Sequence, residues 1–79
     1  MYYVYVIKSI KYQTRYVGST DSVHKRVGEH NIGKCRYTKG RRPWRLIYEE
    51  VFSTRAETMK REKFLKSGQG RKYLDSIFK

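Results

Sequence analysis

The hydrophobic pattern of the first residues predicts a strand that is buried on both of its faces. Residues 2–8 are almost all β-branched or aromatic, which is typical of a strand. Side chains alternate across a strand, so both of its faces are apolar. One face carries Tyr3, Tyr5 and Ile7, and the other carries Tyr2, Val4 and Val6. We therefore expect this strand to be central in a sheet and covered on both sides.

A second strand is predicted to return antiparallel to the first. The polar residues 11–14 indicate a turn, and residues 15–19 resume the strand pattern. This hairpin brings Tyr16 into the neighbourhood of Tyr5, although the pattern leaves the pairing register open.

A helix is predicted next, because residues 20–22 offer side-chain oxygens as N-caps for a helix that runs through about His30. Its apolar stripe consists of Val23 and Val27. Arg26 and His30 are one turn apart and lie beside this stripe. Two interpretations stay open: a solvated arginine with a hydrogen-bonded histidine at a helix end, or a pair directed at a substrate.

The second half of the chain predicts one more strand and two more helices. Residues 31–44 form a loop, residues 46–52 a third strand, and a helix capped by Ser53 or Thr54 runs through about Lys66. Gly68 and Gly70 are expected to break the chain before a short last helix over residues 71–78. The packing side of that helix would consist of Tyr73, Leu74, Ile77 and Phe78. The whole chain, residues 1–79, is interpreted as a single α+β domain in the order β-β-α-β-α-α.

One carboxylate interrupts the apolar side of the second predicted helix. Met59 and Leu65 are three residues before and after Glu62, so the three side chains share a face that we expect to point inward. A buried charge is costly unless it is paired. A salt bridge to one of the many bases would pair it, and so would a hard divalent cation such as Mg²⁺, which uses one or two carboxylates with phosphate oxygens and water.

The charge of the chain indicates a polyanionic partner. The 79 residues carry a formal net charge of +12, with 19 Lys and Arg against 7 Asp and Glu. Nucleic acid is favoured over an anionic membrane surface, since no segment resembles a strongly amphipathic basic helix. No apolar run approaches a membrane span, no signal peptide is evident, and the single Cys35 excludes an intrachain disulfide. A reducing cytoplasm is the expected setting.

The predicted loop concentrates this charge. Between His30 and Tyr48 there are no acids, and the bases alternate with Tyr37 and Trp44. Lys and Arg side chains pair with phosphates, and aromatic rings stack on nucleobases. Trp44, however, is expected in the core. We expect the loop to contact nucleic acid through Lys34, Arg36, Tyr37, Lys39, Arg41 and Arg42.

The polar candidates together match the needs of phosphodiester hydrolysis. Such a reaction needs a base for the attacking water, positive charge on the phosphoryl oxygens and stabilisation of the leaving alkoxide. Tyr5 and Tyr16 are candidate bases, provided that nearby positive charge assists them. Arg26 would supply such charge, His30 would position water or relay a proton, and Glu62 would hold Mg²⁺ or Mn²⁺.

These motifs make the chain similar to the GIY-YIG nuclease family, in particular to small stand-alone bacterial members and to the N-terminal nuclease domain of the excision-repair endonuclease. Tyr3-Val4-Tyr5 matches the first family motif, with Tyr in place of its glycine, and Tyr16-Val17-Gly18 matches the second. The arginine position falls on Arg26, and His30 follows four residues later. Residues 36–66 resemble the segment that leads to the family's glutamate, Glu62.

The resemblance covers essentially the whole chain and implies a fold and an activity. The fold would be a three-stranded antiparallel sheet flanked by helices, and the activity would be cleavage of DNA with one divalent metal ion. One motif tyrosine would act as general base, Arg26 would contact phosphate and Glu62 would hold the metal. The excision-repair relatives carry a lysine after the second motif, where this chain has Ser19.

We therefore expect a metal-dependent DNA endonuclease, of weak or partner-dependent activity, that acts in DNA repair or recombination. Branched or damaged DNA, RNA and a protein partner are left open as further binding partners. The main alternative is a nucleic-acid-binding module with a nuclease fold and no activity. An inward Glu62 would argue against that module. A zinc site is a weaker alternative, because His24, His30 and Cys35 give at most three of the usual four ligands.

Overall fold

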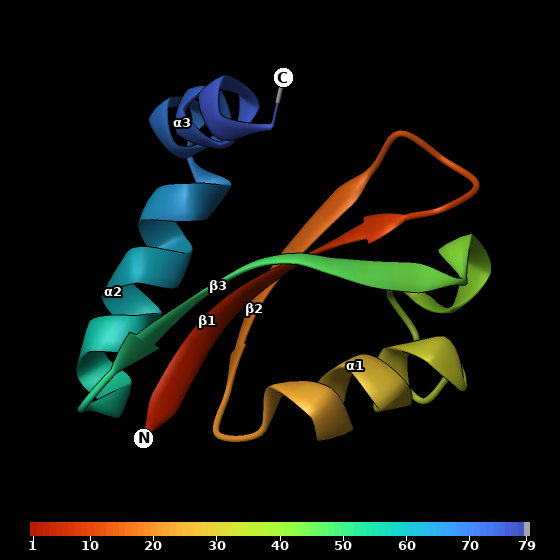
Figure 1. Cartoon of the computed structure of the whole chain (residues 1–79), viewed down its shortest axis with the longest axis horizontal. Coiled ribbons are helices and arrows are strands. Elements are labelled where there is room, and N and C mark those ends of the chain that lie inside the picture. The colour runs from red at the N-terminus through yellow and green to blue at the C-terminus, as the bar shows by residue number, and fades with distance from the viewer. Residues whose placement is uncertain (79) are drawn as a thin grey trace.

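Residues 1–78, the part of the chain that this computed structural model describes, form one antiparallel sheet flanked by helices (Figure 1). The elements in chain order are β1 (Tyr2–Ser9), β2 (Arg15–Thr20), α1 (Val23–Asn31), the 3₁₀ helix η1 (Lys39–Arg41), β3 (Trp44–Phe52), α2 (Arg55–Lys66) and α3 (Gly68–Ile77). The expected α+β class and element order are confirmed. None of the helices within residues 1–78 has the length and apolar content needed to cross a bilayer.

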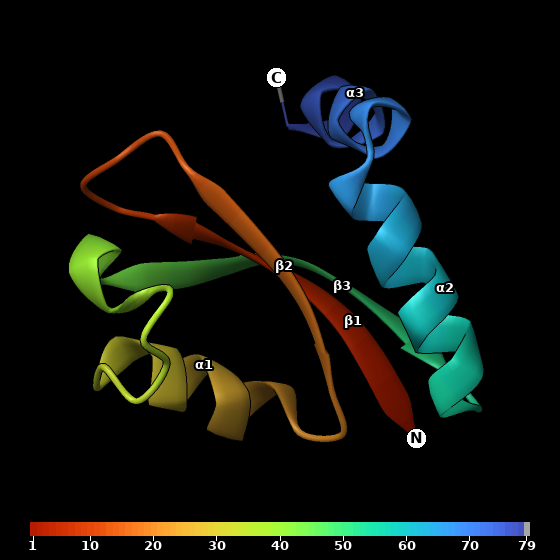
Figure 2. The same ribbon diagram turned by 180° about the vertical axis from the view of Figure 1, so that it is seen from behind.

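The first strand is central, as its two apolar faces predict. The strand order is β2-β1-β3, and both neighbours pair with β1 in antiparallel register. One face of β1 packs in a core cluster with Leu65 of α2 and Leu74 of α3, and the opposite face packs with Val23 of α1 and Trp44. The two views in Figure 1 and Figure 2 show α1 and α2 on either side of the twisted sheet. The expected burial of Trp44 is confirmed.

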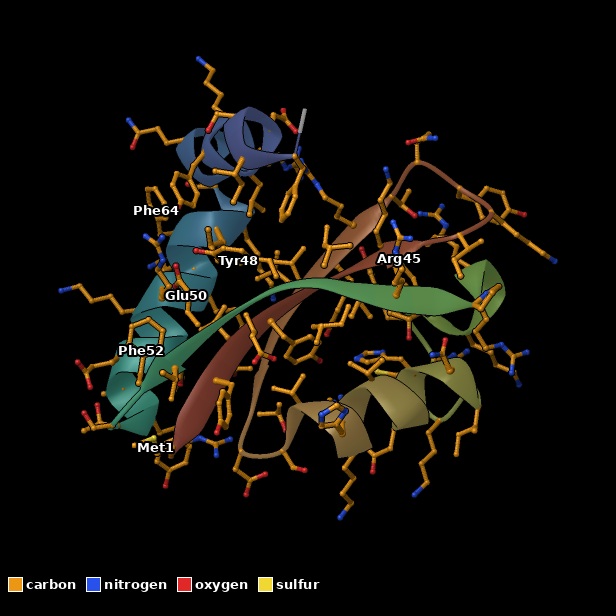
Figure 3. The ribbon with its side chains drawn as sticks, in the orientation of Figure 1. Met1, Arg45, Tyr48, Glu50, Phe52 and Phe64 are labelled. Carbon is orange, nitrogen blue, oxygen red and sulfur yellow. The ribbon has the colours of Figure 1, made fainter. Side chains whose placement is uncertain are left out.

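A polar network fixes α2 against β3 on the face of the sheet opposite α1. Arg61 donates to both carboxylate oxygens of Glu50, from Nε at 2.8 Å and from Nη2 at 3.0 Å. The Arg61 guanidinium also lies 5.0 Å from the ring centroid of Phe64. Figure 3 shows Glu50, Tyr48 and Phe52 along β3 beside α2, with Phe64 above them on the helix. A bidentate pair fixes the relative orientation of its two side chains. This one therefore fixes the rotation of α2 about its axis, and with it the direction of Glu62.

The helix starts follow the predicted caps only in part. Thr54 begins α2 with a full capping box, in which its side chain accepts from the Glu57 backbone N–H and Glu57 reaches back to the Thr54 N–H. At α1 the expected side-chain cap is absent: Ser22 occupies the N-cap position, but its side chain makes no capping hydrogen bond within residues 1–78. Thr20 instead accepts from the Ser22 N–H at 3.1 Å, which closes the turn before the helix.

Two predicted boundaries are wrong. Strand β3 begins at Trp44 rather than at residue 46, because Trp44 pairs with Ser9 at the end of β1. Helix α3 begins at Gly68, and the two glycines do not break the chain. The Ser67 side chain caps α3 by accepting from the Gly70 N–H at 3.2 Å. A Cβ on Gly70 would lie 2.1 Å from the Phe64 carbonyl oxygen, so the glycine permits the close crossing of α2 and α3.

Replacing Gly70 should therefore destabilise the fold, although alanine is the better helix former. We expect Gly70→Ala to lower the free energy of unfolding by about 1–3 kcal/mol, because the clashing atoms belong to the backbone. Gly68→Ala is the matched control, since a Cβ there meets nothing within 4 Å. Urea denaturation of both variants measures the difference. Equal stability of the two would contradict the proposed close crossing.

Candidate active site

The Tyr5 side chain lies directly over the glycine of the second motif. Tyr5 on β1 pairs with Gly18 on β2. A Cβ built on Gly18 would lie 2.5 Å from the Tyr5 hydroxyl oxygen and 2.7 Å from its ring carbon Cζ. Any side chain at position 18 would thus occupy the space of the phenol. The motif glycine is needed for this approach, which leaves Tyr5 only 1% exposed.

His30 of α1 is the hydrogen-bond partner of that phenol. The Tyr5 hydroxyl lies 2.8 Å from His30 Nε2, and His30 Nδ1 lies 2.7 Å from the hydroxyl oxygen of Thr38. His30 is fully buried, so it is part of the packed face of α1 and not beside it, as the periodicity had placed it. Burial, with a smaller contribution from the Arg26 charge, lowers the pKa of His30 and favours a neutral ring.

Tyr16 completes a cluster of three rings. Its ring centroid lies 6.5 Å from that of Tyr5 and 5.1 Å from that of His30, so the predicted proximity of the two tyrosines is confirmed. The structure shows no hydrogen bond to the Tyr16 hydroxyl among residues 1–78. Burial raises the pKa of both phenols, to about 12 for Tyr5, while the Lys66 charge acts in the opposite direction on Tyr16. The two tyrosines therefore differ: one is buried and bonded, and the other is half-buried with its hydroxyl available.

Arg26 lies beside the Tyr5 phenol, where its positive charge lowers the pKa of Tyr5 against the effect of burial. Its Nη1 donates to Glu29 Oε1 at 3.0 Å, and its Nη2 approaches the Cys35 sulfur at 3.5 Å. This arrangement holds the guanidinium at the ring cluster. It remains partly exposed, with 36% of the side chain accessible, so an anion from solvent could reach it.

Glu62 lies at the rim of the inward side of α2, with 23% of its side chain exposed, whereas the prediction that Met59 shares this inward face is wrong. Thr58 and Leu65 are the buried residues of this helix, and Met59 is 61% exposed. The inward side is centred near Leu65, about 60° around the helix from Glu62, which therefore lies at its rim. Glu62 forms the salt bridge that was the simpler interpretation, accepting from Lys66 Nζ at 2.7 Å.

The pair of Glu62 and Lys66 nevertheless lies at the ring cluster. Lys66 Nζ is 5.9 Å from the centroid of the Tyr16 ring, and the Glu62 charge is close enough to act on the pKa of Tyr16. No group of three or more His, Cys, Asp and Glu side chains among residues 1–78 could hold a metal ion. A single rim carboxylate suits Mg²⁺ or Mn²⁺ completed by phosphate and water. Zinc does not fit, since both His30 nitrogens are already hydrogen bonded.

A groove of about 840 Å³ runs past the cluster along β2. Its lining includes Tyr16, Tyr37, Arg41, Lys66 and Arg71. Tyr37 is 84% exposed, and its ring lies 5.9 Å from that of Tyr16. Of the six loop residues expected to contact nucleic acid, Tyr37 and Arg41 thus reach this groove.

The other four loop residues lie elsewhere. Arg42 folds back onto the loop, where its Nε donates to the Lys39 carbonyl oxygen at 2.9 Å. The side chains of Arg42 and Lys39 both lie against Gly33. Lys34 and Arg36 are exposed. The predicted set therefore divides into two residues at the groove and four on the outer surface of the loop.

Sequence reasoning missed two residues of this cluster. Lys66 could have been found, because it follows Glu62 at the i,i+4 spacing of helical ion pairs. Thr38 could not, because its contact with His30 depends on the path of an irregular loop. The positive charge that the excision-repair relatives carry after the second motif is absent at Ser19, and Lys66 brings a positive charge to Tyr16 from α2 instead.

The contact between Tyr5 and Gly18 can be tested by filling its space. We expect Gly18→Ala to lower the free energy of unfolding by about 1–3 kcal/mol, because the new methyl group displaces the phenol from a packed site. Gly28→Ala in α1 is the control, since nothing lies within 4 Å of its Cβ and alanine favours a helix. Chemical denaturation compares the two. If both variants were as stable as the wild type, the phenol would not depend on this glycine.

Comparisons with known proteins agree with the geometry. The model of the GIY-YIG catalytic domain matches residues 1–74. The chain is 45% identical over 67 residues to UPF0213 protein SH2523 of Staphylococcus haemolyticus, covering 84% of this chain and 80% of that one. It is 47% identical over 66 residues to UPF0213 protein YazA of Bacillus subtilis, covering 82% and 66%. The solution NMR structure of UPF0213 protein BH0048 from Bacillus halodurans superposes with a TM-score of 0.57 at 33% identity, covering 98% of this chain and 85% of that one. The chain belongs to the GIY-YIG catalytic domain family, whose activity is of the nuclease type.

Proposed function

We propose that this protein is a divalent-metal-dependent endonuclease that hydrolyses DNA phosphodiester bonds in DNA repair or recombination. The observation that carries the proposal is the convergence of Tyr5, Tyr16 and His30 beside Arg26, with Glu62 and Lys66 at the same edge of the sheet. These residues come from both strands of the hairpin and from two helices on opposite faces. Packing alone does not require so many polar groups to meet at one edge.

Tyr16 is the better candidate for the residue that takes a proton from the attacking water. Its hydroxyl is free of hydrogen bonds within residues 1–78, it borders the groove, and Lys66 lowers its pKa against the effect of burial. Tyr5 is tied to His30 and has a pKa near 12, which makes it a poor base at neutral pH. In this assignment Tyr5 and His30 hold the geometry in which water meets Tyr16.

Positive charge would come from Arg26 and from the ion held by Glu62. Arg26 is fixed by Glu29 and retains access to solvent, so its guanidinium is suited to a phosphoryl oxygen. Mg²⁺ or Mn²⁺ at Glu62 would supply stabilisation of the charge on the leaving oxygen. Lys66, released from Glu62, would then be free to pair with phosphate.

The DNA backbone would follow the groove along β2. Arg41, Lys66 and Arg71 line it. Neutralising phosphates releases counterions, so binding should weaken with salt by a slope of roughly −0.9 per contact on duplex DNA. DNA is the substrate that the family indicates, and this basic path gives a physical reason for its attraction.

Removing the Glu62 carboxylate should abolish cleavage without abolishing binding. We expect wild-type protein to nick supercoiled plasmid and to cut a labelled branched DNA with Mg²⁺ or Mn²⁺ and not with chelator. Glu62→Gln should cut neither substrate, while its DNA affinity and salt slope, measured by fluorescence anisotropy, stay close to wild type. Loss of the helical ion pair should cost only about 0.5 kcal/mol of stability.

Glu49→Gln is the matched control for this experiment, because it makes the same change of charge on the exposed part of β3. Cleavage by wild type and Glu49→Gln together with loss in Glu62→Gln would support the nuclease. Equal cleavage by all three would indicate a contaminating enzyme. Binding without cleavage in every case would favour the nucleic-acid-binding module.

Replacing each tyrosine by phenylalanine should separate their roles. Tyr16→Phe should lower kcat by roughly 100-fold or more, as loss of a general base does, and Tyr5→Phe should lower it less. Because burial raises the pKa of Tyr16, its ionised fraction at pH 7 is small and grows with pH. The wild-type rate should therefore rise between pH 7 and pH 9, and the residual rate of Tyr16→Phe should not. A greater loss in Tyr5→Phe would reverse the assignment.

A further inference from the structure

Thr38 is a buried residue in an otherwise exposed basic loop. It is fully buried, whereas its neighbour Tyr37 is 84% exposed and Lys39 is also exposed. Its carbonyl oxygen accepts from Trp44 Nε1 at 2.9 Å, which anchors the loop to the core. Its hydroxyl oxygen lies 2.7 Å from His30 Nδ1 and 3.4 Å from the Cys35 carbonyl oxygen. Thr38 thus connects the loop directly to the ring cluster.

The positions of the hydrogens on Tyr5, His30 and Thr38 follow from which donors have an acceptor. If Tyr5 donates to His30 Nε2, then Nδ1 carries the ring proton and donates to Thr38, whose own hydrogen points to the Cys35 carbonyl. In the reverse direction the Tyr5 hydrogen would need another acceptor. The structure shows none in residues 1–78, and the neighbouring Arg26 guanidinium carries only donors. Tyr5 is 1% exposed, so the hydrogen would also lack water.

We infer that Thr38 is a positioning residue: it accepts the Nδ1 proton of His30 and so holds the ring with Nε2 facing the Tyr5 hydroxyl. Nε2 is then an acceptor, and it holds the Tyr5 hydroxyl as a donor with its oxygen lone pairs turned away from the histidine. The inference rests on the proposed function for its catalytic consequence, and it is independent of that function for the tautomer itself. It also means that the loop expected to bind DNA cannot shift at Thr38 without disturbing His30.

The effect on cleavage follows from the role of such partners. Groups that fix the orientation and tautomer of a functional histidine typically contribute roughly 10- to 100-fold to activity. Thr38→Val keeps the branched shape and removes the hydroxyl, so kcat should fall by about that factor with KM little changed. Thr38→Ser keeps the hydroxyl and should restore most of the rate. Equal rates in both variants would overturn the catalytic consequence.

The tautomer can be measured without any activity. The chain contains two histidines, so a His24→Gln background leaves His30 as the only imidazole. We would record ¹⁵N NMR spectra of its ring nitrogens above the His30 pKa, where Tyr5, Tyr16, Arg26, Glu29 and Cys35 are the titratable or charged groups around the ring. The expected result is a protonated Nδ1 and an unprotonated Nε2 in the wild type and in Thr38→Ser. Thr38→Val should keep the proton on Nδ1, because Tyr5 still donates to Nε2, but the Nδ1 resonance should shift because its N–H has lost its acceptor.

A wild-type spectrum with the proton on Nε2 would overturn the inference even if Thr38→Val failed to fold. Absence of cleavage in every variant, together with the expected spectrum, would reject the proposed function and leave the tautomer assignment intact. Normal cleavage by Thr38→Val with a shifted Nδ1 resonance would show that the reaction does not depend on this hydrogen bond.

Discussion

The position of the Tyr5 hydroxyl is the constraint on which the rest of the site depends. It lies over Gly18, which has no side chain to displace it, and it is hydrogen bonded to His30 on the helix that covers this face. The sheet and α1 are therefore joined by a polar contact inside an apolar layer. Such a contact has a defined geometry, and it fixes where α1 and the loop after it lie relative to β2.

The distribution of charge follows from how few acids the chain has. Of 7 Asp and Glu residues, four form ion pairs, with Arg15, Arg26, Arg61 and Lys66. Another, Glu57, belongs to the capping box of α2. The basic residues of the loop form no ion pair with an acid among residues 1–78, so their positive charge remains unneutralised, and Arg41 among them lines the groove. A polyanion would be attracted to the same edge where the ring cluster lies.

Local pattern was enough to predict the fold and most of its elements. The doubly apolar β1, the N-cap of α2 and the antiparallel hairpin all follow from nearby residues, and all are confirmed. The errors concern contacts between distant segments. The crossing of α2 and α3 requires Gly70 inside a helix, and the bidentate contact of Glu50 with Arg61 rotates α2 so that Met59 faces solvent. Thr38 joins the site through a tertiary contact with His30 that no local period reveals.

The two motif tyrosines show why sequence alone left the base undecided. They belong to the same hairpin, their ring centroids lie 6.5 Å apart, and their side chains have the same chemistry. Their surroundings differ, because Tyr5 is enclosed between Gly18 and His30 while Tyr16 borders the groove beside Lys66. Enclosure raises the cost of ionising a phenol, whereas an adjacent ammonium group lowers it. In the proposed reaction, proximity to the open edge of β2, more than the residue type, would therefore decide which tyrosine accepts a proton from water.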